Sequence, residues 1–383
     1  MMQQAWTVER EDLAANDPLG PAPARPRPEA LPASLPGATT GSVDVAVPSY
    51  GYGRYLAQCV RSVLQQQVPL RVLVLDDCSL DDTDVVGAAL AAEDPRVTFV
   101  RHEQNRGHIA TFNEGVAWAT GDYMLLLSAD DYLLPHALER AVAMLDAHPE
   151  MSLCVGQARV LLADGGTREV RVDLGQGPAG DRVLDGREFI QMLVDAGGAN
   201  TVVAGTAVVR TRWLRELGGY REDMPHTGDL EMWMRLAAHG SVGIIDAPQA
   251  AYRRHAANMS DGYARNYGMA DLRQRRDAFE VFGRHAADVM PGAERLHRRL
   301  LRALAREAAG QASAAYSDGA LTTSRELMRL ALETAPSVRF TTHYLRVLVK
   351  RLLGVERSRA LLRWRDRRQQ ARPQHRPDGR VVP

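Results

Sequence analysis

Apolar segments of strand length alternate with amphipathic segments of helix length over the first half of the chain. The pattern predicts strands over residues 43–48, 71–75, 97–101 and 123–127, and helices over residues 54–66, 82–92 and 109–120. Strands and helices that alternate at this spacing are typical of βαβ units, in which helices cover both faces of a parallel sheet. The pattern therefore predicts an α/β fold.

The two ends of the chain follow other patterns. The N-terminal stretch is rich in Pro, Ala and Gly and has no sustained periodicity, so we predict a disordered leader. Beyond about Gly268, apolar residues recur at helical spacing to near the end. We predict four parts: a leader (1–41), an α/β domain (42–265), a helical C-terminal region (266–370) and a flexible tail (371–383).

Composition and charge exclude several classes of protein. The chain has 383 residues, of which 45% are hydrophobic and 25% charged, as in soluble globular proteins. The formal net charge is zero, which gives no reason to expect nucleic acid as a partner. Cys59, Cys78 and Cys154 show no pairing pattern, and the chain lacks a signal-peptide profile and any apolar run of about 20 residues. These features together predict a cytoplasmic protein.

The C-terminus is strongly basic. Residues 351–383 hold ten Arg against Glu356, Asp366 and Asp378. This segment, which also contains Trp364, is compatible with peripheral docking on anionic lipid at the inner face of a membrane. A run of charge is more often a solvated surface, so both interpretations stay open.

The segment YMLLLSADDYLL, residues 123–134, carries the strongest chemical signal. Its apolar strand stops at Ser128, and Asp130 and Asp131 follow at the carboxyl end, where open α/β sheets bind ligands. Adjacent carboxylates repel each other and cost desolvation energy unless a cation or hydrogen-bond donors compensate them. The pair therefore indicates a divalent metal or a polyhydroxylated substrate. The alternative is an acidic cap on a helix that begins near Pro135.

A dinucleotide-binding site is a competing interpretation of the first turn. Gly51 and Gly53 occupy the first two glycine positions of that fingerprint, and Asp76 ends the next strand, as the fold requires. The third glycine position is Leu56, whose side chain would obstruct the close contact between helix and strand. Pro48 also interrupts the strand before the turn. An oxidoreductase of this class is the weaker alternative.

Five segments in order resemble the family 2 inverting glycosyltransferases. They are VAVPSYGYGRYLAQCVRSVLQQ, VLVLDDCSLDDT, NRGHIATFNEGVAWATGDYMLLLSADDYLLP, HTGDLEMWMRL and YRRHAANMS. The resemblance covers the chain from Val43 to about Ser260. It implies the GT-A fold, a Rossmann-like architecture that binds nucleotide sugars. It also implies transfer of a sugar from a nucleotide-diphosphate sugar, with UDP or dTDP favoured, to a hydroxyl acceptor.

The resemblance assigns the donor-binding residues to the first two strand ends. It implies that Pro48, Ser49 and Tyr50 surround the base and ribose. It also implies that Asp77, with Asp76 beside it, accepts a hydrogen bond from the imide nitrogen of uracil or thymine. The alternative is that this acidic pair and its Ser and Thr neighbours cap the next helix.

The same resemblance implies a metal site at the acidic pair. Asp130 would bind Mg²⁺ or Mn²⁺, with Asp131 beside it, and Ser128 would contact the ribose. His255 would be a further partner of the metal or the diphosphate, and Arg254 would pair with phosphate. Such a metal neutralises charge on the leaving diphosphate. A lone histidine is more often structural, so the role of His255 rests on the resemblance.

The segment HTGDLEMW resembles the motif that carries the catalytic base. Asp229 would take the proton from the acceptor hydroxyl as that hydroxyl attacks the anomeric carbon from the face opposite the diphosphate, and Glu231 is a second acidic candidate. One displacement inverts the configuration. The alternative is that both carboxylates complement the helix dipole.

Three positions depart from the family's pattern. Cys78 replaces a glycine, Ser128 replaces the first acidic residue of the metal signature, and Gly228 replaces the Glu that usually precedes the base. A catalytically weakened nucleotide-sugar-binding or scaffolding module therefore remains an alternative function.

The acceptor is weakly specified by the sequence. The resemblance places the segment Gly197–Tyr220 along the acceptor side, where Thr206 or Trp213 could contact a sugar. The helical spacing of Trp213 and Leu217 equally suits a core position. The acceptor could be a glycan, a lipid-linked sugar or a small-molecule hydroxyl compound.

Overall fold

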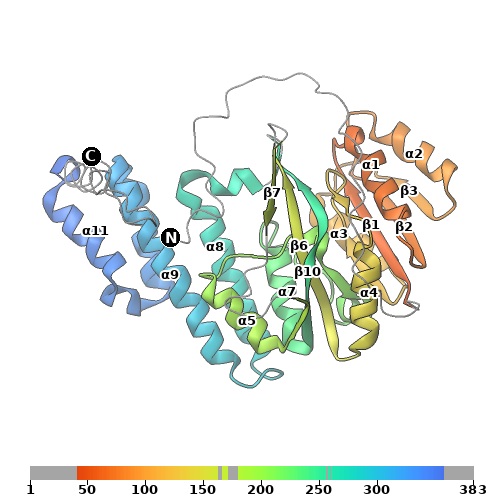
Figure 1. Cartoon of the computed structure of the whole chain (residues 1–383). Helices are drawn as coiled ribbons and strands as arrows, with labels where there is room; N and C mark the ends of the chain where they lie inside the picture. The colour runs from red at the N-terminus through yellow and green to blue at the C-terminus, as the bar shows by residue number, and fades with distance from the viewer. Residues whose placement is uncertain (1–40, 163–165, 171–179, 256–257, 259, 358–383) are drawn as a thin grey trace, which may run out of the picture. The chain divides into compact units, whose positions relative to one another are not determined.

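A mixed sheet of ten strands forms the centre of the described chain (Figure 1). The computed structural model describes residues 41–162, 166–170, 180–255, 258 and 260–357. Nearly all of the predicted leader and the whole predicted tail lie outside these residues. The strands are β1 Val43–Ser49, β2 Leu70–Asp76, β3 Val97–Arg101, β4 Tyr123–Leu126, β5 Tyr132–Leu133, β6 Met151–Leu161, β7 Thr167–Val170, β8 Arg182–Leu184, β9 Val208–Arg210 and β10 Ser241–Arg253.

Helices cover the sheet and form the C-terminal part of the chain. They are α1 Gly53–Leu64, α2 Thr83–Glu93, α3 His108–Trp118, α4 Ala137–Ala147, α5 Gly186–Asp195, α6 Thr211–Glu216, α7 Gly228–His239, α8 Ser260–Ala286, α9 Ala293–Asp318, α10 Leu321–Thr334 and α11 Thr342–Leu353, with short 3-10 helices η2 Ala204–Thr206 and η3 Pro336–Phe340.

The first half of the sheet is parallel, as the alternating pattern predicts. The strand order is β3-β2-β1-β4-β9-β6-β10-β5, and β1 pairs in parallel with both β2 and β4. Every residue of β1 is buried, as expected for a central strand with helices on both faces. The apolar residues Leu56, Val60 and Val63 of α1 are buried at helical spacing. The predicted α/β fold is confirmed.

The second half of the sheet is mixed and was not predicted in detail. β9 runs antiparallel between β4 and β6, whereas β10 runs parallel to β6. The register between β6 and β10 shifts on both sides of Pro248, which has no N–H to donate to the ladder. Such irregularities hide the period of two, which is why the sequence indicates only broken strands here.

The C-terminal region is helical, and its first helix, α8, begins within the last residues of the predicted α/β domain. α8 contains non-helical backbone from Arg265 to Gly268, where Asn266, Tyr267 and Gly268 all have positive φ. The predicted boundary between residues 265 and 266 falls at this interruption. α9 buries a row of small residues that includes Ala305, Ala308, Ala309 and Ala312, and it contacts α8, α10 and α11.

Two further findings bear on the sequence predictions. Cys59, Cys78 and Cys154 are all free thiols. Among the helices that the structure describes, none has both the length and the apolar run needed to cross a lipid bilayer.

Candidate active site

The carboxyl ends of three neighbouring strands meet at one edge of the sheet. Ser49, at the end of β1, lies opposite Asp76 at the end of β2. The Asp77 N–H donates to the Ser49 carbonyl at 2.9 Å, and on the other side of β1 the Ala129 N–H donates to the Pro48 carbonyl at 3.2 Å. The structure therefore brings the predicted donor residues and the acidic pair after β4 to the same edge.

Three buried polar atoms at this edge lack a hydrogen-bond partner among the described residues. They are Ser49 Oγ, Asp76 Oδ2 and Asp130 Oδ1, one from the end of each strand. Arg101 Nε lies 3.6 Å from Asp76 Oδ2, beyond hydrogen-bond distance. Because an unsatisfied buried polar group is costly, such atoms usually meet a ligand, an ion or ordered water. The edge is therefore suited to a polar ligand.

Hydrogen bonds from the backbone and from His102 fix the Asp77 carboxylate. Its carboxylate accepts hydrogen bonds from the backbone N–H groups of Arg106, at 2.7 Å, and Gly107, at 2.9 Å. His102 Nδ1 lies 2.8 Å from Asp77 Oδ1. A carboxylate has about four acceptor sites, so Oδ2 keeps capacity for one more donor. Asp77 thus fixes the turn before α3, and its predicted contact with a base is limited to that one position.

The loop after β2 keeps the shape that a glycine would give it. Cys78 has φ 66°, in the left-handed region that glycine adopts without strain. Ser79 completes the loop, since its Oγ accepts from the Gly51 N–H at 2.9 Å. Gly53 is required for a different reason, because a Cβ there would lie 2.8 Å from the Thr83 backbone nitrogen. The glycine pair that resembles a dinucleotide fingerprint thus has structural roles.

His255 contacts the acidic pair directly. Its Nε2 lies 3.1 Å from Asp130 Oδ2, and its ring stacks on Tyr55 with 5.7 Å between centroids. Tyr52 meets the same ring edge-on at 5.6 Å. Burial, together with the negative charge of Asp130 and Asp131, raises the pKa of the Tyr52 hydroxyl. Tyr50, by contrast, is half-exposed at this edge.

Asp131 is bound by Arg253. The Arg253 N–H donates to Asp131 Oδ1 at 2.8 Å, and its Nε donates to the Asp130 carbonyl at 2.9 Å. Burial and the neighbouring Asp130 charge raise the pKa of the Asp131 carboxyl well above its usual range. The Arg254 N–H instead extends the pairing with β6 through the Leu161 carbonyl.

Several of these contacts were not predicted from the sequence. Tyr52, Tyr55 and Gln58 meet His255 or Arg253, and they recur every three residues at the start of α1. That spacing places them on one face of the helix. This polar and aromatic face of α1 was the signal that could have identified them.

Two protein ligands are available for a cation at the acidic pair, namely Asp130 and His255. Among the described residues, no three His, Cys, Asp or Glu side chains are grouped closely enough to hold a metal by themselves. Mg²⁺ commonly uses one or two carboxylates and completes its shell with waters and substrate phosphates. The unpartnered Asp130 Oδ1 is consistent with an ion bound in that way.

Asp229 lies in the first turn of α7 and is half-buried. Its Oδ2 accepts from Asn200 Nδ2 at 2.8 Å, and its Oδ1 accepts from the Leu230 N–H at 2.7 Å. Burial raises the pKa of the Asp229 carboxyl, and these two hydrogen bonds oppose the rise. Asn200 was not predicted individually, although it lies within the segment expected to line the acceptor side.

The start of α7 abuts the start of α3. His108 Nε2 lies 2.7 Å from the Pro225 carbonyl, and a Cβ on Gly228 would be 3.4 Å from Ile109 Cδ1. Gly107, immediately before this turn, is the residue whose N–H binds Asp77. Asp77 and the residues just before Asp229 therefore both adjoin the first turn of α3.

Glu231 does not share the environment of Asp229. It is 1% exposed, and Arg235 NH2 donates to its Oε2 at 2.8 Å. The same guanidinium donates to the carbonyls of Leu217 and Gly219. Glu231 therefore belongs to a buried ion pair that fixes the loop after α6.

The two residues predicted to contact the acceptor make contacts within the protein. Thr206 is buried, and its hydroxyl donates to the Val203 carbonyl at 2.8 Å. The Trp213 ring lies against His239, with 5.0 Å between ring centroids. Trp213 thus packs against α7, as its helical spacing allowed.

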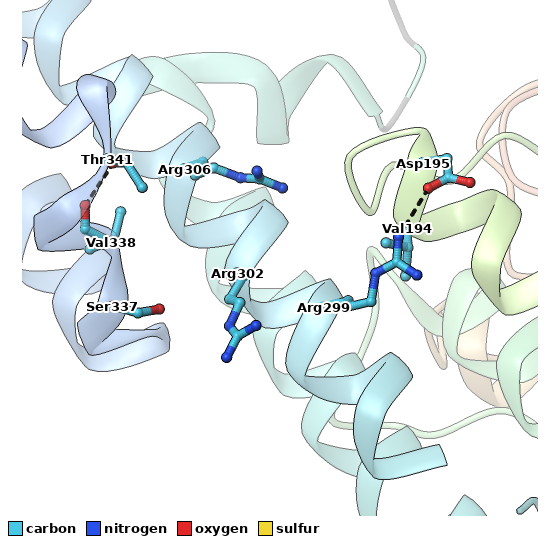
Figure 2. Close-up of a pocket in the computed structure, with 8 residues that line it drawn as sticks. All are labelled: Val194, Asp195, Arg299, Arg302, Arg306, Ser337, Val338 and Thr341. Atoms are coloured by element: carbon cyan, nitrogen blue, oxygen red, sulfur yellow. Dashed lines mark hydrogen bonds and ion pairs between the residues drawn. The ribbon is translucent and has the colours of Figure 1, made fainter. Parts of the chain in front are cut away.

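A separate cavity of about 430 Å³ lies between α5, α9 and η3, and none of the predicted site residues lines it (Figure 2). Arg299, Arg302 and Arg306 line it from α9. Arg299 is also within 3.5 Å of Asp195 at the end of α5.

Comparisons with known proteins agree with this architecture. The profile of the family described as Glycosyl transferase family 2 matches residues 44–218. An uncharacterized protein of Mycobacterium tuberculosis is 28% identical over 219 residues, which cover 56% of this chain and 67% of that protein. EpsE of Bacillus subtilis, which its name places among the glycosyltransferases, is 28% identical over 215 residues, or 55% and 72% of the two chains.

Among solved structures, residues 1–349 of TarS from S. aureus, in complex with UDP-GlcNAc, superpose with a TM-score of 0.61. The superposition covers 88% of this chain and 95% of that one at 15% sequence identity. At that identity the similarity establishes a shared fold, which includes the helical C-terminal region.

Proposed function

We propose that this family 2 glycosyltransferase, whose residues 44–218 match the family profile, transfers a sugar from a UDP- or dTDP-sugar to a hydroxyl acceptor. The transfer would invert the configuration at the anomeric carbon. The observation that carries the proposal is the set of three buried polar atoms, of Ser49, Asp76 and Asp130, that have no hydrogen-bond partner among the described residues. In the proposed site they would act as acceptors for the nucleotide and as ligands for a cation on the diphosphate.

The donor would lie along the ends of β1, β2 and β4. Pro48, Ser49 and the half-exposed Tyr50 would surround the base and ribose, and the Ser128 hydroxyl would face the ribose. Asp77 Oδ2 would accept the imide N–H of the base in its remaining position, while its other bonds keep the turn before α3 in place. Uracil and thymine offer this imide N–H and cytosine lacks it, which favours UDP or dTDP over CDP.

A divalent cation would be held by Asp130 and His255, the two groups that meet at 3.1 Å. When bound, Mg²⁺ or Mn²⁺ supplies positive charge that stabilises the leaving diphosphate. Arg253 holds the acidic pair in position through its contacts with Asp131 and the Asp130 carbonyl. Arg254 remains a candidate partner for phosphate.

Asp229 would act as the general base. Its half-buried carboxylate would accept the proton of the acceptor hydroxyl as the new bond to the anomeric carbon forms. The bond from that carbon to the diphosphate oxygen breaks in the same step, and the nucleotide diphosphate leaves. Because burial raises the pKa of Asp229, its carboxylate is a better proton acceptor than an exposed aspartate.

A donor panel tests this proposal. Purified protein is incubated with UDP-, dTDP- and GDP-sugars, each with and without Mn²⁺, and released nucleotide diphosphate is measured. We expect release from UDP- or dTDP-sugars that depends on Mn²⁺. Tight donor binding without release, even with a range of glycan and lipid-linked acceptors, would instead identify a nucleotide-sugar-binding module.

A further inference from the structure

The last described helix, α11, has apolar side chains on two faces. Val347 is its one buried residue, and α11 contacts α9. A second apolar row consists of Leu345, Leu348, Val349 and Leu352, which are 50%, 37%, 53% and 88% exposed. This spacing of three and four residues places the row on one side of the helix. Phe340, just before α11, is 79% exposed.

We call these five exposed residues the α11 stripe. Single exposed apolar residues are ordinary on protein surfaces. A row of four on one short helix, preceded by an exposed aromatic ring, is the pattern of an interaction surface. Its partner must offer an apolar environment and must tolerate the charges that surround the stripe.

The charged residues of α11 and of the turn before it are all positive, and the nearest acidic residues in the sequence are Glu333 and Glu356. The segment from Pro336 to Val355 contains no Asp or Glu, whereas it holds Arg339, Arg346, Lys350 and Arg351. The three arginines are exposed, and Arg339 lies over the Phe340 ring with 5.1 Å between its guanidinium carbon and the ring centroid. The apolar stripe is therefore bordered by cationic side chains.

The positive region extends from α11 to α9. Burial lowers the pKa of the His343 imidazole, and the positive charges of Arg346 and Arg306 lower it further, so both guanidinium groups lie near this ring. Arg306 and Arg302 also line the cavity beside η3, which ends at Phe340 (Figure 2). Residues 358–383, which follow in the sequence, add eight Arg against Asp366 and Asp378.

Charge complementarity selects among the partners that could cover the stripe. A second copy of the chain, or the Arg-rich tail folded back, would bring positive charge against positive charge. An anionic lipid surface would instead neutralise the arginines and accept the apolar side chains at the boundary between headgroups and acyl chains. We propose that the α11 stripe docks the protein on an anionic bilayer surface, with α11 parallel to the membrane plane.

Vesicle sedimentation tests the proposal with the full-length protein. Vesicles of phosphatidylcholine containing about 30% phosphatidylglycerol are compared with vesicles of phosphatidylcholine alone, at low and high salt. We expect binding to the anionic vesicles only, and a loss of at least about tenfold in affinity for Leu352→Asp. Val85→Asp introduces the same charge at another exposed apolar residue, 68% exposed on α2, and should bind like the wild type.

A second variant separates the stripe from its charges. Arg346→Gln combined with Arg351→Gln should weaken binding and reduce its salt dependence, because fewer cations meet the lipid surface. Thermal unfolding checks that every variant is folded. The proposal would be overturned if the wild type did not bind anionic vesicles. It would also be overturned if Leu352→Asp bound them as well as the wild type does, because the Arg-rich tail alone would then explain the binding. A dimeric wild type that Leu352→Asp converts to monomer would also overturn it in favour of a second copy.

Discussion

His255 and Asp130, separated by 125 positions in the sequence, meet with 3.1 Å between Nε2 and Oδ2. Asp130 follows β4 and His255 follows β10, and two strands, β9 and β6, lie between these in the sheet. The contact therefore requires the mixed half of the sheet to be in place. It is the most direct evidence that separate sequence motifs form one site.

Replacing Asp130 with Ala should weaken donor binding in a metal-dependent way. The change removes a predicted metal ligand and the buried unpartnered Oδ1. Calorimetric titration with UDP should give an affinity at least about tenfold lower in the presence of Mn²⁺. Without Mn²⁺ the two proteins should differ little. Asp94→Asn, in an ion pair with Arg96 away from the site, is the matched control, and equal Mn²⁺ dependence in Asp130→Ala and wild type would remove Asp130 as a ligand.

Asp229→Asn should abolish most of the transfer and preserve donor binding. The amide keeps the shape of the side chain but cannot accept the proton, and loss of a general base typically costs about 10²–10⁴-fold in rate. Single-turnover rates and UDP affinity should be measured side by side. Asp223→Asn, in the exposed pair with Arg221, should keep the wild-type rate. A fully active Asp229→Asn enzyme would exclude this residue as the base.

The pH dependence of activity should report the environment of Asp229. Its pKa is raised by burial, so the active carboxylate form should be lost as pH falls through that raised value. The Asn200 side chain donates to the carboxylate and stabilises its charged form. Asn200→Ala should therefore raise the pKa further and move the acid limb of the kcat/KM profile to higher pH. If the acid limb of the kcat/KM profile does not shift in Asn200→Ala, the group that titrates there is not Asp229.

Glu231→Gln should affect stability more than chemistry. Removing the charge leaves Arg235, itself 6% exposed, without its buried counter-charge. Breaking a buried pair in this way costs about 3–5 kcal/mol in the free energy of unfolding. Denaturant unfolding should detect this, while Glu294→Gln, in an exposed pair with Arg298, should change stability by less than about 0.5 kcal/mol. A stable variant with no activity would instead support a catalytic role for Glu231.

Cys78→Gly should be neutral or stabilising. Cys78 adopts φ 66°, and a left-handed backbone costs a residue with a side chain about 1–2 kcal/mol more than glycine. The greater freedom of glycine in the unfolded chain offsets about 0.4–1 kcal/mol of that gain. Thermal unfolding should show no loss of stability, and donor affinity should be unchanged. A clear loss of donor affinity would mean that the Cys78 side chain itself contributes to the site.

The sequence predicted those parts of the fold whose patterns are local. β1, β2 and α1 follow simple periods, so their positions could be predicted within a few residues. The strand pair β6 and β10 could not, because Pro248 and the register shifts beside it break the alternation. In the site, the position of the acidic pair after a buried strand indicated a ligand site, and the resemblance to the family singled out Asp229; both stay predictions as ligand and base. The contacts of Arg253 and Asn200 depend on long-range packing that no local pattern contains.

The position of β10 has a practical consequence for anyone who works with fragments of this protein. The family profile ends at residue 218, before α7 and before β10, which joins β6 to β5 within the sheet. A recombinant fragment trimmed to the recognised segment would expose the long edge of β6 to solvent and to other molecules, inviting aggregation. It would also lack Asp229 and His255, so an inactive fragment of this kind would say nothing about the enzyme.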